Sequence, residues 1–235
     1  MKIFTDQYIN CGDFITLENN EINNEINNEI KPSISVDLDG TLADIMSRVN
    51  ELRSEDLKNN NIKIIRKEDI TAYDLKKTTP YKDISYEQIN EYMKKAWMDP
   101  SNIKLEYNKI PEILKNLHNY YEIYIVTATI AEDDKIKEWL ACNDIVYDKL
   151  IHLDKQCKKA EHIAQIHIDD CSELVSIIPS DKTLILLSQP WNKNNIGELL
   201  KEHKNVVYLE NWKEVENYLI ETYNFKRNNT KHRIY

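Results

Sequence analysis

The sequence predicts an α/β fold in which a doubly wound parallel sheet carries a small helical insertion after its first strand and helix. Apolar segments of strand length alternate with helix-length segments from residue 111 onward. Such alternation favours parallel strands joined by right-handed helical crossovers. A β-branched segment, ISV, leads directly into Asp-x-Asp-Gly-Thr at residues 37–41. Between these regions the chain is polar and tyrosine-rich and lacks a strand pattern, which predicts the insertion.

Residues 1–31 are predicted to be an N-terminal extension. They contain a four-residue repeat, EINN, that places Ile22, Ile26 and Ile30 on one face of a helix. Paired asparagines are poor helix formers, and polar tracts of low complexity are usually solvated. We therefore interpret this segment as a linker.

The core is predicted to comprise residues 32–54 and 108–223, with residues 55–107 forming the helical insertion. Within the insertion, residues 86–98 have an amphipathic helical pattern that ends at Asp99-Pro100. The expected strands after it are 122–127, 149–153, 166–169, 183–187 and 206–209. The expected helices are 43–57, 111–118, 133–142, 155–165, 195–203 and 212–223, with a helical turn at 174–177. Residues 224–235 form a basic tail that is predicted to be disordered.

Composition limits the classes of partner. The net charge is −9 and the pI is near 5.3, which argues against a nucleic-acid or anionic-membrane surface. A small anionic substrate held by a metal and a few lysines remains compatible. The four cysteines, at positions 11, 142, 157 and 171, have no CxxC spacing, which indicates reduced thiols in a cytoplasmic protein. The longest apolar stretches are of strand length, far too short to span a bilayer.

The first predicted strand is followed by two aspartates whose carboxylates lie close together in the chain. Alternate side chains of a strand share a face, so Asp37 and Asp39 should point the same way and repel each other. An ordinary Asp-Gly hairpin turn is the alternative. However, the residues after Gly40 continue in a helix-like pattern and not as a returning strand.

Other polar residues follow later strands, and the carboxyl ends of parallel strands meet at one edge of a sheet. The strand 122–127 ends at Thr127. The strand 166–169 ends at Asp169, and Asp170 follows it directly. Clustered aspartates cannot all stay ionised without positive charge, so a hard cation with oxygen ligands is expected, most simply Mg²⁺. Because adjacent strand residues point to opposite faces, one aspartate of the pair should bind the metal and the other should act indirectly.

These groups suit phosphoryl transfer. Thr127 and the backbone N–H groups that follow it, beginning at Ala128, can hold phosphate oxygens, and Lys155 can neutralise developing charge. Lys158 and Lys159 are rivals for the lysine position. Taken alone, Thr127 would be read as a helix cap, Lys155 as solvent-facing and the acidic pair as an N-cap. It is their order along the chain that favours a site.

That order resembles the haloacid dehalogenase-like (HAD) phosphohydrolases over residues 33–220, and most closely the 5′(3′)-deoxyribonucleotidases. The segments that carry the resemblance are VDLDGTLAD, YEIYIVTAT, LDK, HIDDCSEL, LLSQPWNKN and NWKEVENYL. The resemblance implies a Rossmann-like, HAD-like core with a helical cap at residues 55–107. The chain differs from the family in having some 30 residues before the first motif.

The resemblance also implies roles for the site residues. Asp37 would be the nucleophile and Asp39 the general acid and base. Mg²⁺ would be bound by the Asp37 carboxylate, the Asp39 backbone carbonyl and one of the later acidic pair. Thr127 and Lys155 would complete the catalytic set. Cap aromatics stack on the nucleobase in this family, which makes Trp97 and Tyr73 substrate-binding candidates.

We therefore predict a cytoplasmic Mg²⁺-dependent 5′-nucleotidase that hydrolyses (deoxy)ribonucleoside monophosphates through an aspartyl-phosphate. One alternative is a phosphatase of the same fold that acts on sugar phosphates or other small metabolites. A 3′-phosphate nucleic-acid end-processing enzyme is disfavoured by the acidic balance, and a non-catalytic regulatory protein is disfavoured by the complete set of competent residues. The sequence leaves the oligomeric state open, a homodimer included.

Overall fold

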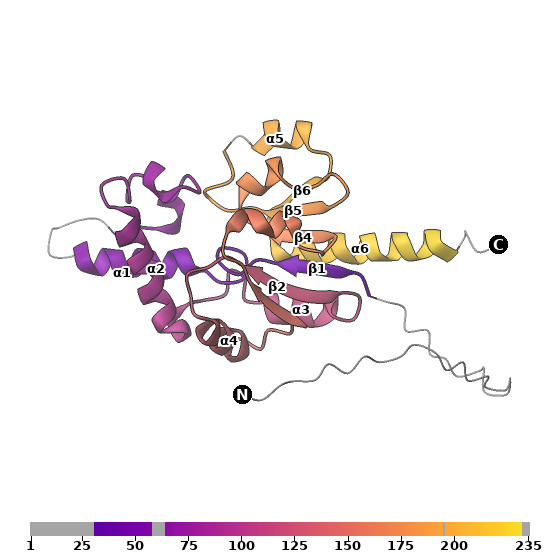
Figure 1. Cartoon of the computed structure of the whole chain (residues 1–235), viewed down its shortest axis with the longest axis horizontal. Helices are drawn as coiled ribbons and strands as arrows, with labels where there is room; N and C mark the ends of the chain where they lie inside the picture. Colours follow the sequence, from indigo (N-terminus) through magenta and orange to yellow (C-terminus); the bar gives the residue numbers. More distant parts are fainter. Residues whose placement is uncertain (1–30, 58–63, 195, 232–235) are drawn as a thin grey trace, which may run out of the picture. The chain divides into compact units, whose positions relative to one another are not determined.

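A six-stranded parallel sheet forms the centre of the core (Figure 1). The computed structural model describes residues 31–57, 64–194 and 196–231. The strand order is β3-β2-β1-β4-β5-β6. The strands are β1 (Ser33–Val36), β2 (Glu122–Thr127), β3 (Lys149–His152), β4 (Ile166–Asp169), β5 (Thr183–Leu187) and β6 (Val206–Leu209). The sheet confirms the predicted doubly wound α/β class, because the strand order reverses direction between β1 and β4. Of the predicted N-terminal extension, residues 1–30 lie outside the described residues.

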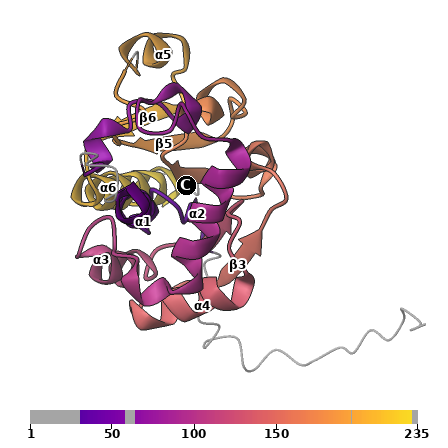
Figure 2. The same cartoon turned by 90° about the vertical axis from the view of Figure 1, so that its left-hand side faces the viewer.

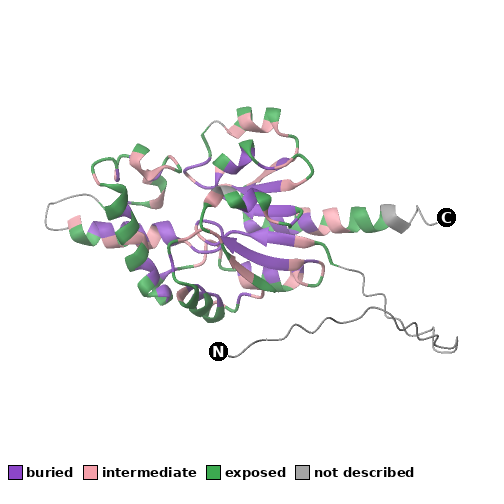
Figure 3. Cartoon of the chain, in the orientation of Figure 1, coloured by how far each residue is buried: buried purple, intermediate pink, exposed green. Residues whose placement is uncertain are grey.

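Helices cover both faces of this sheet, as a parallel sheet requires. They are α3 (Ile110–Leu117), α4 (Asp133–Cys142), α5 (Ile196–Glu202) and α6 (Trp212–Lys231), with the 3-10 helices η5 (Gln156–Glu161) and η6 (Ser172–Ser176). Alternate residues of β5 show the two faces. Ile185 and Leu187 belong to the cluster that includes α3, α4 and α6, whereas Leu184 and Leu186 belong to a second cluster with η6 and α5. Buried residues accordingly follow the strands (Figure 3).

The cap is a separate group of helices beyond the carboxyl end of β1. It consists of α1 (Ile45–Leu57), η2 (Lys67–Asp69), η3 (Leu75–Lys77), α2 (Tyr86–Met98) and η4 (Pro100–Asn102). A capping box starts α2, since the Ser85 hydroxyl accepts the Gln88 N–H at 3.2 Å and the Gln88 side chain accepts the Ser85 N–H at 3.0 Å. Helix α1 makes its most extensive contacts with α2 and further contacts with η2, and it lies beside α2 in Figure 2. We therefore propose that the cap begins at α1 and not at residue 55.

The chain crosses between core and cap at residues 42–44 and again at residues 104–106, and these two crossings together are called the hinge below. They run antiparallel and are joined by a β-bridge between Ala43 and Leu105. The cap is therefore connected to the core by a short two-stranded element.

Two predicted elements differ from the structure. The segment expected to be an α-helix at 155–165 forms the short 3-10 helix η5, which ends at Glu161. Helix α6 continues to Lys231, so residues 224–231 are helical where a disordered tail was predicted. No glycine or proline interrupts this stretch, and its two adjacent asparagines are not enough to end the helix. None of the helices in the described ranges has both the length and the apolar character needed to cross a membrane.

Candidate active site

The loop after β1 places the first aspartate at the edge of the sheet. The Asp37 N–H donates to the Ile168 carbonyl at 2.9 Å, which extends the pairing of β1 with β4 by one residue. Gly40 then turns the chain with φ of +78°, a conformation that disfavours a side chain. A Cβ at this position would also lie 2.7 Å from Oδ2 of Asp170. Glycine is required here because the loop passes directly against the second acidic pair.

Lys159 is the lysine of the site. Its Nζ lies 2.6 Å from Oδ1 of Asp37 and 2.9 Å from Oδ2 of Asp169, and its side chain is 4% exposed. Burial lowers the pKa of Lys159, but the charges of the two aspartates raise it more, so the ammonium stays charged. The predicted residue, Lys155, is exposed and precedes η5. The sequence assignment to Lys155 is wrong because the turn of η5 directs the residue four positions later into the core.

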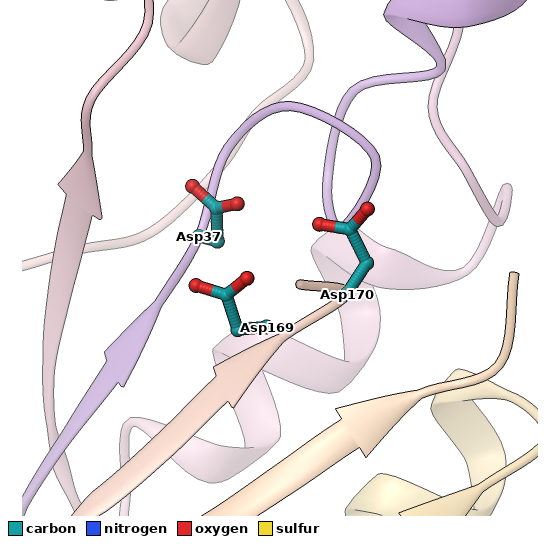
Figure 4. Close-up of side chains that lie close together, drawn as sticks. All are labelled: Asp37, Asp169 and Asp170. Atoms are coloured by element: carbon teal, nitrogen blue, oxygen red, sulfur yellow. The ribbon is translucent and has the colours of Figure 1, made fainter. Parts of the chain in front are cut away.

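Asp37, Asp169 and Asp170 converge at the ends of β1 and β4 (Figure 4). One carboxylate oxygen from each lies within 4.8 Å of the other two, and all three residues are buried. The expectation that Asp169 and Asp170 would diverge does not hold. Strand β4 ends at Asp169, so the alternation of a strand no longer applies to the next residue.

The charges of this cluster fit a divalent cation. Burial raises the pKa of Asp37 well above its usual range, and the neighbouring Asp169 raises it further. Burial and Asp169 likewise raise the pKa of Asp170 to about 7. Lys159 supplies one positive charge against three carboxylates. The donor set is therefore short of positive charge and consists of hard oxygen ligands, which is the chemistry that Mg²⁺ prefers.

The loop after β5 holds Asp170 in place. Trp191 Nε1 donates to Oδ2 of Asp170 at 2.6 Å, and Asn192 Nδ2 donates to the Asp170 backbone carbonyl at 2.8 Å. The Thr41 hydroxyl donates to Oδ1 at 3.4 Å. These orienting residues were missed as individual site residues. The segment LLSQPWN contains two of them, Trp191 and Asn192, and is part of the family resemblance. The positions of these residues in the sequence do not by themselves indicate that they contact Asp170.

Asp39 has a different environment from Asp37. Its Oδ1 accepts the Nε1–H of Trp97 at 3.2 Å, and the Thr129 hydroxyl also bonds the carboxyl group. Burial raises the pKa of Asp39 above its usual value, as a proton donor needs. The side chain is not part of the three-carboxylate cluster, so any metal contact from Asp39 would have to come from its backbone carbonyl.

Trp97 is not an open stacking surface. It is 1% exposed and packs edge-on against Trp139, with ring centroids 6.3 Å apart. The prediction that Trp97 stacks on a nucleobase is therefore wrong, because the amphipathic pattern of α2 directs this side chain into the core and toward Asp39. Tyr73, the other predicted aromatic, is 36% exposed and remains a candidate.

Two cavities, each of about 240 Å³, meet above the aspartates. The first, called the phosphate cavity, is lined by Asp37, Asp39, Tyr73, Asn90, Met93, Thr127, Ala128, Thr129, Ile130 and Gln156. The second, called the cap cavity, is lined by Asp39, Gly40, Ile45, Met46, Ile70, Ala72, Tyr73, Leu75, Ile89, Asn90, Met93, Asp170 and Trp191. They share four residues, among them Asp39 and Tyr73.

The phosphate cavity contains the predicted Thr127 and Ala128 as well as both aspartates of the first motif. Thr127 is 1% exposed and its Oγ1 accepts the Thr129 N–H at 3.2 Å, which leaves its own proton for an oxygen in the cavity. Two carboxyl groups, those of Asp37 and Asp39, and the buried hydroxyl of Thr127 thus face one space. The arrangement can bind a phosphoryl group, attack it and protonate a leaving oxygen.

Comparison with known proteins identifies the family of this chain. Residues 31–225 match the family model described as 5′ nucleotidase, deoxy (Pyrimidine), cytosolic type C protein. A search of curated proteins found no match.

Several solved structures with a similar fold are described as HAD-like hydrolases or phosphatases. A haloacid dehalogenase-like family hydrolase from Streptococcus pneumoniae is 16% identical with a TM-score of 0.54, over 80% of this chain and 98% of that one. A predicted phosphatase from Clostridium acetobutylicum is 16% identical with a TM-score of 0.56, over 81% of this chain and 99% of that one. A predicted phosphoglycolate phosphatase from Haemophilus somnus is 15% identical with a TM-score of 0.51, over 79% and 96%.

At these identities the solved structures establish the fold, whereas the family model covers most of the sequence. The protein therefore belongs to the 5′ nucleotidase, deoxy (Pyrimidine), cytosolic type C family and is a HAD-type phosphatase.

Proposed function

We propose that this protein is a Mg²⁺-dependent nucleotidase that hydrolyses the phosphate ester of nucleoside 5′-monophosphates. The main observation in support of the proposal is that Asp39 lines both cavities. The phosphate cavity holds the reacting groups, and the cap cavity lies on the side of the acid that would protonate the leaving oxygen. A phosphate monoester bound this way would place its leaving group under the cap.

The lining of the cap cavity favours a flat, largely apolar leaving group. Seven of its side chains are aliphatic or thioether groups, namely Ile45, Met46, Ile70, Ala72, Leu75, Ile89 and Met93. Tyr73 and Trp191 add aromatic surface, and Asn90 can pair with the edge of a base. A sugar phosphate would leave most of its hydroxyls without partners in this space, at a cost of about 1–3 kcal/mol for each one buried.

The proposed reaction has two steps on this chain's own groups. Asp37 attacks phosphorus while the bond to the leaving oxygen breaks, and Asp39 gives its proton to that oxygen. Asp39 then takes a proton from water as the water attacks the aspartyl-phosphate and releases Asp37. Thr127 and the Ala128 N–H hold the phosphoryl oxygens in both steps, and Lys159 keeps its positive charge against Asp37.

Asp37, Asp169 and Asp170 are the side chains that would hold Mg²⁺. When bound, the ion supplies positive charge that keeps these carboxylates ionised and offsets charge on the phosphoryl oxygens.

The alternative is a HAD-type phosphatase of another small metabolite, such as a sugar phosphate. One of the structures with a similar fold is described as a predicted phosphoglycolate phosphatase. No cationic side chain lines the cap cavity within the described residues, so a second carboxylate or phosphate on the leaving group would be unpaired there. This favours the nucleotidase.

A substrate panel tests the proposal. We expect kcat/KM for dUMP, dTMP, dGMP or their ribonucleotides to exceed that for sugar phosphates and phosphoglycolate by at least about 100-fold, because burial of the base contributes on the order of 3 kcal/mol. Tyr73→Ala should lower kcat/KM for nucleotides about tenfold and leave a small phosphate ester almost unchanged. Tyr86→Ala, which alters another exposed cap tyrosine, is the control. Preference for phosphoglycolate or a sugar phosphate would refute the nucleotidase.

Removal of the metal is a second test. We expect EDTA to lower kcat at least about 100-fold and Mg²⁺ to restore it, since the site lacks positive charge without it. Mg²⁺ should also raise the unfolding temperature of the wild type by mass action, and raise it much less in Asp169→Asn. Activity that is indifferent to chelation, with no thermal shift, would exclude the metal.

A further inference from the structure

The hinge is held by backbone and side-chain contacts at the same place. The Asp44 N–H donates to the Lys104 carbonyl, and the Glu106 N–H donates to the Leu42 carbonyl, each at 2.8 Å. Movement of the cap relative to the core has to change the angles or register of these segments. The side chains that lie on the hinge can therefore set the position of the cap.

One cap lysine pairs with both hinge carboxylates. Nζ of Lys67, from η2, lies 2.5 Å from Oε2 of Glu106 and 3.4 Å from Oδ1 of Asp44. The three side chains are only 17%, 7% and 18% exposed, so solvent screens them weakly. Burial raises the pKa of Glu106 to about 7, although Lys67 opposes the shift. Oε1 of Glu106 is buried without a hydrogen-bond partner among the described residues. The charge of this carboxylate thus depends on Lys67.

The same ammonium also contacts the core. Nζ of Lys67 lies 5.4 Å from the centroid of the Trp191 ring, within the range of a cation–π contact. Trp191 in turn donates its Nε1–H to Asp170 at 2.6 Å. Lys67 therefore touches both segments of the hinge and the side chain that orients a candidate metal ligand.

We propose that Lys67 is a positioning residue, which fixes the cap over the active site by neutralising the paired hinge carboxylates and resting on Trp191. Without its charge, and at a pH above the raised pKa of Glu106, the carboxylates of Asp44 and Glu106 repel each other across adjacent segments and the cap loosens. The cap supplies Ile89 and Met93 to the cap cavity, so a loose cap weakens substrate binding more than the chemical step. The kinetic consequence rests on the function proposed above, whereas the contacts of the hinge do not.

Steady-state kinetics of variants that remove the charge of Lys67, alone or together with the charge of Glu106, test this role. This experiment and the exchange measurement below use about pH 9, above the raised pKa of Glu106. We expect Lys67→Met to raise KM about tenfold and to change kcat by less than about threefold. The double variant Lys67→Met, Glu106→Gln should return KM to within about threefold of the wild type, since the carboxamide removes the unpaired charge. Lys77→Met, at an exposed lysine of the same cap, should have no effect. Equal losses in the single and double variants would overturn the proposal.

Amide hydrogen exchange provides a readout independent of activity. In the free protein with Lys67→Met, the amides of Asp44 and Glu106 should exchange about tenfold faster, while those of β1 keep their protection. The double variant should restore the hinge amides. Unchanged hinge protection in Lys67→Met, or an equal rise throughout β1, would refute local positioning by Lys67. If the wild type hydrolyses no nucleotide, the proposed function fails, and the exchange rates still decide the role of Lys67.

Discussion

Replacement of Asp37 by Asn is expected to lower kcat by at least about 10⁴-fold, as the loss of other enzymatic nucleophiles does. A carboxamide cannot attack phosphorus, and the other carboxyl group in the lining of the phosphate cavity, that of Asp39, is assigned as the proton donor. The fold should survive, because the carboxamide oxygen can still accept the Leu38 N–H, now bonded at 2.7 Å. One carboxylate is also removed from a cluster in which burial and Asp169 already raise the pKa of Asp37.

Steady-state kinetics with the preferred nucleotide and a thermal unfolding scan measure both parts of this expectation. Asp134→Asn is the matched control, because the Asp134 side chain is 95% exposed on α4 and far less constrained. It should retain full activity. If Asp37→Asn retains more than about 1% of wild-type kcat with the expected mass, the nucleophile has been assigned incorrectly.

Replacement of Lys159 by Met is expected to lower kcat/KM about 10³-fold. The ammonium is the cation that contacts Asp37 and Asp169 directly, at 2.6 and 2.9 Å, and loss of a single preorganised electrostatic group typically costs 10²–10³-fold in rate, as a rough guide. Stability should also fall by about 3–5 kcal/mol, since two buried carboxylates lose their partner. Activity should therefore be compared at a temperature where thermal unfolding shows both proteins to be folded, with Mg²⁺ present.

The control for this variant is Lys155→Met, the position that the motif spacing suggested. Lys155 is exposed, so its replacement should change kcat/KM by less than about twofold. Lys158→Met should behave similarly, because Lys158 pairs with Asp154 on the surface at 2.6 Å. A greater loss in Lys155→Met than in Lys159→Met would contradict the active-site geometry described above.

The sequence predicted the sheet and its first and later motifs because these depend on local signals. Strand segments such as 184–187 are continuous and apolar, as a sheet buried on both faces requires. The carboxylates follow these strands directly, so their meeting at one edge could be inferred from strand order alone. Asp37, Thr127 and Asp169 accordingly lie at the strand ends where the sequence placed them.

Features that depend on turn geometry could not be read in this way. Lys155 and Lys159 differ by four residues, and the 3-10 conformation of η5 decides which of them is buried. The strand alternation used for Asp170 failed because β4 stops one residue earlier. Trp97 had an amphipathic pattern compatible with either a core or a substrate contact, and only the packing against Trp139 distinguishes them. Long-range pairs such as Lys67 with Glu106 leave no trace in the spacing of a single sequence.

The covalent step through Asp37 is the central claim, and trapping of the phosphorylated enzyme tests it most directly. Asp39→Asn lacks the proton-transfer group of both steps, but the leaving oxygen of p-nitrophenyl phosphate needs no proton, so with this substrate the second step should be the one that is slowed. After acid quench during turnover of p-nitrophenyl phosphate, peptide mass spectrometry should find one phosphoryl group on the peptide that contains Asp37, and none in Asp37→Asn. A phosphoryl group on another residue would contradict this account. So would an unmodified Asp39→Asn protein while it still releases phosphate.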